Sequence, residues 1–95
     1  MNKDIQIAKK TVQTSINALK KLSSSFNRSL QFSKAVNLMC KTKSKVCVVG
    51  VGKSFLIGSR VASTLSSLGI PSVAFSANEL SHGGLCFFSK EDIIL

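Results

Sequence analysis

Two short stretches of the chain carry side chains suited to chemistry. The first runs from Gly50 to Ser54 (Gly-Val-Gly-Lys-Ser) and follows directly on the apolar residues 46–49. Glycines at the end of a buried strand let the backbone turn tightly and leave amide groups open to an anion. The amino end of a following helix adds partial positive charge, and Lys53 adds a full one. The pattern predicts a phosphate or carboxylate site; the alternative is a plain glycine turn with Lys53 in solvent.

Two familiar phosphate loops do not fit this stretch. A Walker loop requires a glycine where the chain has Cys47, and a dinucleotide fingerprint that starts at Gly50 requires one where it has Phe55. Gly58 comes three residues too late for that fingerprint. A nucleotide triphosphatase and a Rossmann dehydrogenase are therefore disfavoured.

The second stretch contains Glu79 and His82, followed by Gly83 and Gly84. A histidine accepts and returns a proton near neutral pH, which suits proton transfer in catalysis. On its own, however, this His82 fits a residue that caps a turn before two glycines, and Glu79 fits a cap of the same turn. From the residues alone both readings stay open.

The elements that must position these groups follow from the apolar spacing and the breakers. Residues spaced by three or four predict helices over 4–22, 29–41 and 53–68, and Gly69 with Pro71 ends the third. Apolar runs predict strands at 45–49, 71–75 and 92–95. Strands separated by helices indicate an α/β fold with a parallel sheet behind two amino-terminal helices.

The predicted sheet is cut off at its third strand. Ligands of open parallel sheets lie beyond the carboxyl ends of the strands, where neighbouring loops converge. The chain supplies the loops after its first two strands and stops inside the third. We therefore expect the front part of a larger protein.

Composition narrows the class of protein further. The 95 residues form at most one small domain, and no apolar run or leader pattern predicts a membrane span or a signal peptide. The net charge is +9, with twelve of the thirteen basic residues in positions 1–60. Solvated helix faces explain this better than nucleic-acid binding, because no aromatic side chains are interleaved with the lysines. Cys40, Cys47 and Cys86 show no metal-ligand spacing and are expected to be buried thiols in a reducing cytoplasm.

Several motifs together resemble the start of a sugar isomerase (SIS) domain. They are Val48–Ser54, Ile57-Gly58, Leu68–Pro71 and Glu79–Gly83, and the branch they resemble most is that of the arabinose-5-phosphate isomerases (KpsF/GutQ-type). The likeness runs through residues 30–95, and the amino-terminal helices match in pattern only. It implies a flavodoxin-like, SIS-type sheet in an oligomeric cytoplasmic enzyme that interconverts ribulose 5-phosphate and arabinose 5-phosphate. In bacteria with lipopolysaccharide or certain capsules that reaction feeds synthesis of the sugar acid Kdo. Complete members continue into the rest of the SIS domain and usually a pair of CBS modules.

The resemblance also assigns roles to individual residues. Lys53 and His82 fall on the family's active-site lysine and histidine, so both are expected to be catalytic. Substrate binding is expected from Gly50, Gly52, Ser54 and Glu79. No cofactor or metal is expected, and the expected partners are a sugar phosphate and, when the protein is complete, further copies of itself, with no nucleic acid and no membrane.

The chain departs from the family pattern at five positions close to these residues. The family's Gly-His pair is replaced by Phe55 and Leu56, its His-Pro pair by Ser76 and Ala77, and its aspartate by Gly84. Bulky Phe55 is expected to narrow the site. Three hypotheses therefore stand at this point: part of an aldose–ketose isomerase, a sugar-phosphate-binding module without catalysis, and an inactive remnant.

Overall fold

A computed structural model describes residues 2–95 and confirms the predicted fold class. Helices precede a parallel three-stranded sheet with α/β connections. The chain divides into two compact units, one ending at Lys34 and the other spanning Ala35–Leu95. No helix among residues 2–95 is both long and apolar enough to cross a membrane.

The first unit is mainly one long helix, α1 (Lys3–Ser25). The helix begins with a cap, because the Asn2 side chain accepts a hydrogen bond of 2.9 Å from the backbone N–H of Asp4. It extends three residues beyond the expected end at residue 22, and Ser25 Oγ donates to the carbonyl of Leu22. A 3-10 helix (Phe26–Arg28) follows, and the Phe26 ring lies 4.7 Å from that of Phe32. Helix α2 (Leu30–Lys41) then crosses from the first unit into the second.

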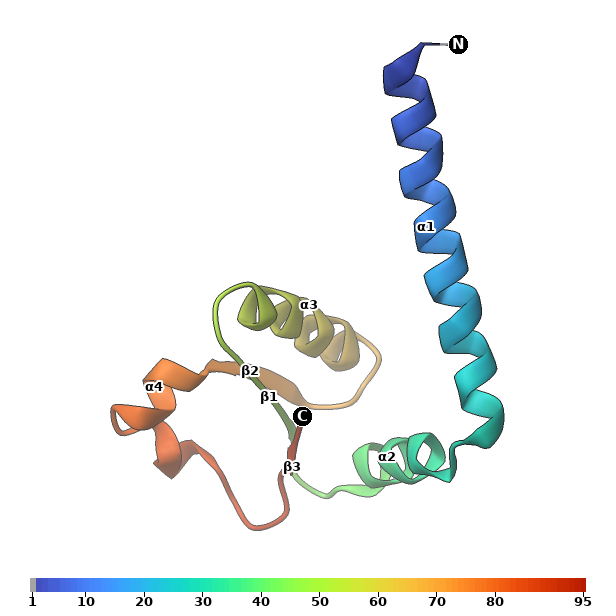
Figure 1. Ribbon diagram of the computed structural model, residues 1–95. Helices are drawn as coiled ribbons and strands as arrows, with labels where there is room; N and C mark the ends of the chain where they lie inside the picture. The colour runs from blue at the N-terminus through green and yellow to red at the C-terminus, as the bar shows by residue number, and fades with distance from the viewer. Residues whose placement is uncertain (1) are drawn as a thin grey trace. The chain divides into compact units, whose positions relative to one another are not determined.

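The sheet of the second unit contains β1 (Val46–Gly50), β2 (Ser72–Ser76) and β3 (Ile93–Ile94) in the order β2-β1-β3. Both pairings are parallel, and the register places Gly50 opposite Ser76 at the carboxyl ends. The order 2-1-3 is how a flavodoxin-like sheet begins. The chain therefore passes from β1 to β2 on one side of β1 and then crosses to β3 on the other side, as Figure 1 shows.

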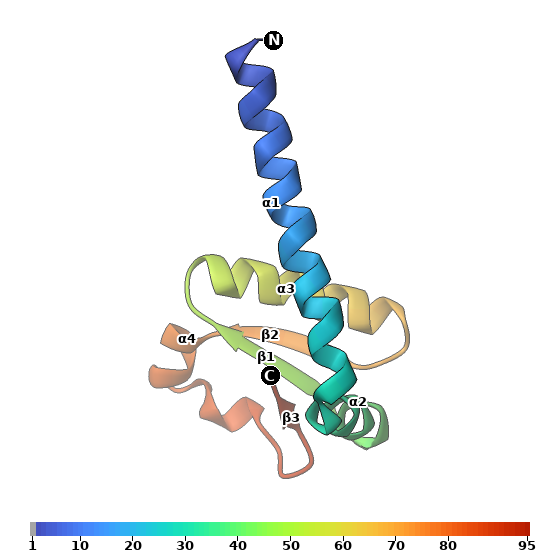
Figure 2. The ribbon, with the colours of Figure 1, turned by 45° about the vertical axis from the view of Figure 1, so that its right-hand side comes forward.

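Helix α3 (Lys53–Ser67) lies along one face of β1 and β2, as the two views of Figures 1 and 2 agree. Val46, Val48 and Ala62 form the core between helix and sheet. Gly69, with φ of 95°, stops the helix in the left-handed conformation that the sequence predicts. The partly buried side chains packed on this core are Met39, Leu65, Ile70, Ala74 and Ile93.

The segment after β2 contains two short helices. They are α4 (Ala77–Ser81), which is little more than one helical turn, and a 3-10 helix (Gly84–Phe87). Phe75 of β2 anchors it, with its ring 5.8 Å from Phe87 and 5.4 Å from Phe88. Phe75 is separated from Phe87 and Phe88 by more than ten residues, so hydrophobic periodicity does not predict these ring contacts.

The expectation of three buried cysteines is wrong for two of them. Cys47 is buried within β1, whereas Cys40 at the end of α2 and Cys86 are exposed. Cys47 is buried because it lies on a central strand with a neighbour on each side.

Candidate functional site

Three glycines, two before α3 and one within it, position the loop between β1 and α3, and each has a different role. A Cβ on Gly50 would lie 2.8 Å from the backbone nitrogen of Phe55, so only glycine lets the first turn of α3 fold back onto the strand end. Gly52 has φ of 59° and ψ of −124°, a conformation that L side chains rarely adopt. A Cβ on Gly58 would lie 2.8 Å from Cγ1 of Val48, so this glycine lets α3 approach β1 closely. Together they fix the start of α3 at the carboxyl end of β1.

The start of α3 presents unpaired donors. Ser54 N–H donates to the carbonyl of Val51, and Leu56 N–H donates to that of Gly52. Within residues 2–95 the amides of Gly52 and Lys53 donate no backbone hydrogen bond, and the Lys53 ammonium forms no ion pair. The side chains of Lys53 and Ser54 are exposed. Amides, ammonium and helix dipole thus all favour an anion at this point.

This loop also lies where an open sheet of this order binds ligands. The chain turns from β1 to β2 on one side and to β3 on the other, so β1 and β3 flank the point where the strand order reverses. Val49 N–H donates to the carbonyl of Leu95 at 2.9 Å, which places the chain after β3 beside the end of β1. The predicted anion loop therefore adjoins the switch point of the sheet.

Glu79 and His82 lie together on a separate pocket. The pocket has a volume of about 450 Å³, and both residues line it with Phe75 and Phe87. No residue of the loop from Gly50 to Ser54 lines it. The reason is topological, because α4 follows β2 on the side of β1 away from β3. The structure therefore brings Glu79 and His82 together but does not join them to Lys53 in one cavity.

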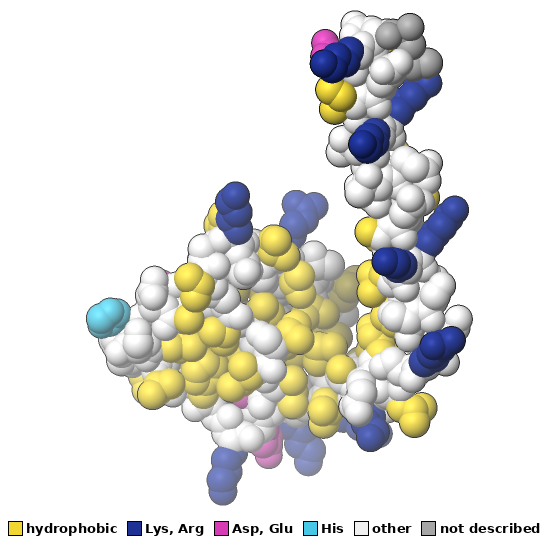
Figure 3. Space-filling model, viewed as in Figure 1, with side chains coloured by type: hydrophobic (Ala, Val, Ile, Leu, Met, Phe, Trp, Pro, Cys, Tyr) yellow, Lys and Arg dark blue, Asp and Glu magenta, His cyan; other side chains and the backbone are white. Residues whose placement is uncertain are grey.

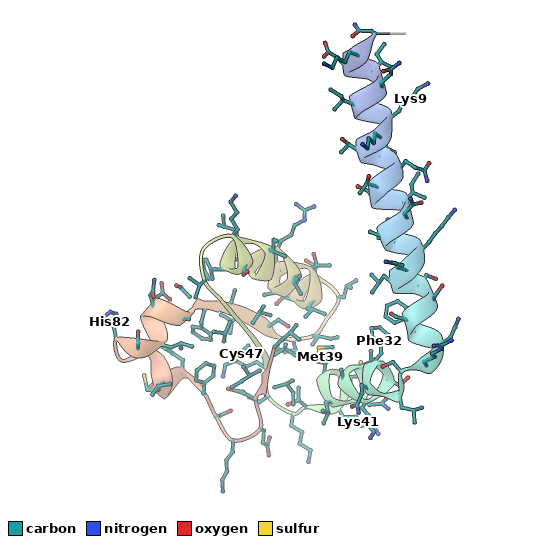
Figure 4. All side chains as sticks on the ribbon, viewed as in Figure 1. Lys9, Phe32, Met39, Lys41, Cys47 and His82 are labelled. Carbon is teal, nitrogen blue, oxygen red and sulfur yellow. The ribbon has the colours of Figure 1, made fainter. Side chains whose placement is uncertain are left out.

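His82 is exposed and points away from the sheet, as Figure 4 shows. It directly follows the last residue of α4 as the C-cap, and its N–H donates to the carbonyl of Glu79 at 3.2 Å. Gly83 follows with φ of 101°, a conformation that favours glycine. The residue thus has the position of a turn cap and a side chain open to solvent, which leaves its catalytic role a prediction.

Two of the departures from the family pattern have a visible structural setting. Phe55 is half-buried, with its backbone against Gly50, and it does not line the pocket of Glu79. Gly84 is buried, and a Cβ there would lie 2.9 Å from the carbonyl oxygen of Glu79. The glycine therefore lets the 3-10 helix pack tightly against α4.

A buried carboxylate at the opposite edge of the sheet was not predicted. The Asp92 side chain is 1% exposed, and its Oδ2 lies 2.8 Å from Lys45 Nζ. Ser89 donates to it from its N–H (2.7 Å) and its hydroxyl (2.9 Å), and the Ser44 hydroxyl donates to Oδ1. Lys45 precedes β1 and Asp92 precedes β3, so the cluster joins the amino ends of the two strands. The available signal is that charged residues of opposite sign start two strands of one parallel sheet.

The cluster changes the titration of three groups. The hydrogen bond from Lys45, followed by those from Ser44 and Ser89, holds the pKa of Asp92 far below its usual range. The same bond to Asp92 raises the pKa of Lys45. Burial raises the pKa of the Cys47 thiol. Ligands of open sheets bind at the carboxyl edge, so this cluster at the amino edge is structural.

No group of three or more potential metal ligands occurs among residues 2–95. The anion loop contains backbone amides, the Ser54 hydroxyl and the Lys53 ammonium. Phosphate and carboxylate are the ligands that such a donor set can hold.

Comparison with known proteins gives a consistent assignment. No protein-family model matches the chain. It is 42% identical over 64 residues to the arabinose 5-phosphate isomerase KdsD of Pseudomonas aeruginosa, covering 67% of this chain and 20% of that protein. It is 34% identical over 90 residues to KdsD of Yersinia pestis, covering 95% of this chain and 27% of that protein. The chain thus spans less than a third of the length of these relatives.

A solved structure matches over nearly the whole chain. It is that of the Escherichia coli CFT073 protein c3406 in complex with arabinose 5-phosphate, with a TM-score of 0.72 and 27% sequence identity. The match covers 99% of this chain and 50% of that one. The similarities in sequence and in fold both agree with the family resemblance of the motifs between Gly50 and Gly83. The chain is therefore an SIS-type, KpsF/GutQ-like partial domain.

Proposed function

We propose that this chain supplies the phosphate-binding loop of an aldose–ketose isomerase that interconverts ribulose 5-phosphate and arabinose 5-phosphate. The observation that carries the proposal is the set of unpaired amides at Gly52 and Lys53, beside the exposed Lys53 ammonium. Relatives named as arabinose 5-phosphate isomerases and a structural neighbour in complex with arabinose 5-phosphate support it. The proposal includes a cytoplasmic location and the supply of arabinose 5-phosphate to Kdo synthesis, as the family resemblance implies.

In this proposal Lys53 acts as a point charge. It holds either the phosphate of the sugar or the oxyanion of an enediol intermediate, which carries more negative charge than the ground state. The glycine backbone at Gly50 and Gly52 lets the ligand approach the amides closely. Ser54 adds a hydroxyl at the same helix start.

His82 and Glu79 serve as the proton-transfer and sugar-binding groups of the proposal. Both line one pocket on the β2 side. An exposed imidazole is free to accept and return a proton near neutral pH, which suits ring opening or proton transfer between oxygens. This part of the proposal is carried by the motif match rather than by contact with the anion loop.

A second candidate function is sugar-phosphate binding without catalysis. The observation that favours it is that His82 points into solvent and shares no pocket with Lys53. Replacement of the family's polar residues at Leu56, Ser76 and Gly84 favours it too.

A binding and turnover experiment separates these candidates. We expect arabinose 5-phosphate, but not arabinose, to shift the amide NMR signals of residues 52–54. Lys53→Ala should weaken that binding about tenfold, a change of about 1.4 kcal/mol. Lys90→Ala, which removes an exposed lysine at the other edge of the sheet, should not.

The same samples are then assayed for conversion of ribulose 5-phosphate. Conversion that Lys53→Ala abolishes supports the isomerase. Binding without conversion selects the binding module. If neither binding nor conversion is seen, both proposals fail and the inactive remnant stands.

A further inference from the structure

Helix α1 carries an apolar stripe along one side of its length. At about 3.6 residues per turn, this side carries Ile5, Val12, Ile16, Leu19 and Leu22. These five side chains are between 39% and 64% exposed, and no residue of the helix is buried. Proteins rarely leave a contiguous apolar surface of this extent in water. The stripe is therefore a surface on which a partner can dock.

The first unit is also strongly basic. Residues 2–34 contain seven lysine and arginine side chains and a single acidic one, Asp4. After Asp4 the next acidic residue of the chain is Glu79. Within residues 2–95 none of these seven cations forms an ion pair. Figure 3 shows apolar side chains along one side of α1 and lysines that project from the helix. The charge of these lysines is therefore free to meet an anionic surface.

The lysines of α1 fall into two groups around the helix. Lys9 and Lys20 lie at the border of the apolar stripe. Lys3, Lys10 and Lys21 lie on the opposite side. A lysine at the border keeps its stem along the apolar surface and extends its ammonium to the level of lipid headgroups. One side of α1 thus combines apolar groups with flanking cations, which is the arrangement of helices that lie in a lipid interface.

Aromatic side chains lie at the carboxyl end of the same helix. The rings of Phe26 and Phe32 are 4.7 Å apart, and the two residues are 45% and 53% exposed. Arg28 lies between them in the sequence and is exposed as well. Phenylalanine is a typical apolar anchor of interfacial helices. The exposed ring pair beside an arginine therefore continues the apolar and cationic surface of α1.

We propose that residues 2–34 bind an anionic lipid surface, with the apolar stripe of α1 in the headgroup layer. Apolar side chains alone fit a groove of another protein, and cations alone fit a nucleic acid. Proteins that bind nucleic-acid strands use aromatic side chains among the cations, and α1 contains none. Charge complementarity with acidic headgroups accounts both for the excess of lysine and for its place beside the stripe. The proposal departs from the family resemblance, which implies no membrane partner.

The first test compares two kinds of vesicle with the full 95-residue chain. We expect the chain to co-sediment at least about tenfold more tightly with phosphatidylcholine vesicles that contain about a third phosphatidylglycerol than with phosphatidylcholine alone. Raising the salt from about 0.1 M to about 1 M shortens the Debye length from about 10 Å to about 3 Å and should abolish this preference. Equal binding to both kinds of vesicle overturns the proposal. So does binding to neither, even if the chain then associates with itself or with another protein through the stripe.

The apolar part of the proposal is tested on two isoleucines that are two residues apart. Ile5 lies on the stripe and is 49% exposed, whereas Ile7 lies outside it and is 55% exposed. Ile5→Gln should weaken binding to the anionic vesicles at least about fivefold, because a polar side chain replaces an isoleucine that lipid covers. Ile7→Gln makes the same chemical change on the other side and should alter binding less than about twofold. Equal effects of the two variants overturn the proposed place of the stripe in the lipid.

The charge is tested with two pairs of lysines that have the same spacing. Lys9→Gln with Lys20→Gln removes the two cations beside the stripe. Lys10→Gln with Lys21→Gln removes two cations on the opposite side. Each lysine at a lipid surface strengthens binding about fivefold, so the first pair should weaken binding about thirtyfold and the second less than about fivefold. Equal losses overturn the proposed orientation of α1. None of these residues belongs to the loop from Gly50 to Ser54, so the test does not depend on the proposed function.

Discussion

Lys53 and Asp92 are two charged residues at opposite edges of one sheet, and their surroundings give them opposite uses. Lys53 is exposed and forms no ion pair within residues 2–95, so its charge is available to a ligand. Asp92 is enclosed by Lys45, Ser44 and Ser89, so its charge is already satisfied. A free charge at the carboxyl edge suits binding, and a satisfied one at the amino edge suits stability.

The Asp92 cluster predicts how stability depends on pH. A carboxyl whose pKa is lower in the folded than in the unfolded chain stabilises above the unfolded pKa, about 3.9. That contribution is lost as the pH falls below this value, so the urea midpoint of the wild-type chain should drop in acid. The raised pKa of Lys45 acts in the other direction, and its contribution is lost as the pH rises above 10.5.

Asp92→Asn is expected to lower the urea midpoint at neutral pH and to remove much of the acid dependence. Glu91→Gln is the matched control, because its carboxylate is adjacent in sequence and forms no ion pair within the described residues. Equal acid dependence in the wild-type chain and in Asp92→Asn would show that the cluster does not stabilise the fold. The comparison requires only unfolding curves at several pH values.

The sequence predicts Lys53 and its glycine loop but not Asp92. The loop is local, because Gly50, Gly52 and Lys53 are neighbours and their types alone indicate the turn and the charge. The Asp92 cluster depends on the register of β3 against β1, which brings together Lys45 and Asp92, 47 positions apart in the chain. The relation of His82 to Lys53 is also non-local, since it depends on which side of β1 each connecting segment lies.

Among the elements, the packing of α3 on β1 depends most sharply on one atom. A Cβ at Gly58 would lie 2.8 Å from Val48 Cγ1, and Val48 is only 8% exposed, so it has little room to move. Gly58→Ala is expected to lower the free energy of unfolding by about 1–3 kcal/mol through overpacking. This loss should exceed the gain of about 1 kcal/mol that alanine brings to a helix interior. Urea unfolding measures the difference.

A second variant tests whether this contact is the cause. Val48→Ala removes the crowded methyl groups and is itself destabilising, because it leaves a gap in the core. In the double variant the alanine at position 58 should no longer clash. The loss of unfolding free energy in the double variant should therefore be smaller than the sum of the losses in the two single variants. A favourable coupling of about 1 kcal/mol is expected. Additive losses within about 0.5 kcal/mol would contradict a clash between these two positions.

The regular elements could be predicted and the 3-10 helices could not. Helix α3, its stop at Gly69 and the parallel strands follow from periodicity and from one glycine. Helix α1 extends three residues past the predicted end at residue 22, to Ser25, whose hydroxyl donates to the carbonyl of Leu22. The 3-10 helix that follows α4 ends at Phe87, and the rings of Phe87 and Phe88 contact Phe75, a tertiary contact that periodicity does not reveal.

In the molecule as a whole, burial is concentrated in the second unit. The buried apolar side chains among residues 2–95 are Val46, Cys47, Val48 and Ala62, and no residue of α1 is buried. Opening free energies follow buried contacts, so the two units should differ in local stability. Most of the stability of helices in proteins comes from tertiary packing of an apolar face, and α1 buries none of its residues.

Amide hydrogen exchange should therefore be faster in α1 than in β1. Residues 46–50 form the central strand and should exchange slowest. No residue of α1 is buried, so its amides should open and exchange at a lower free energy. Exchange in α1 as slow as that in β1 would contradict the link between burial and local stability.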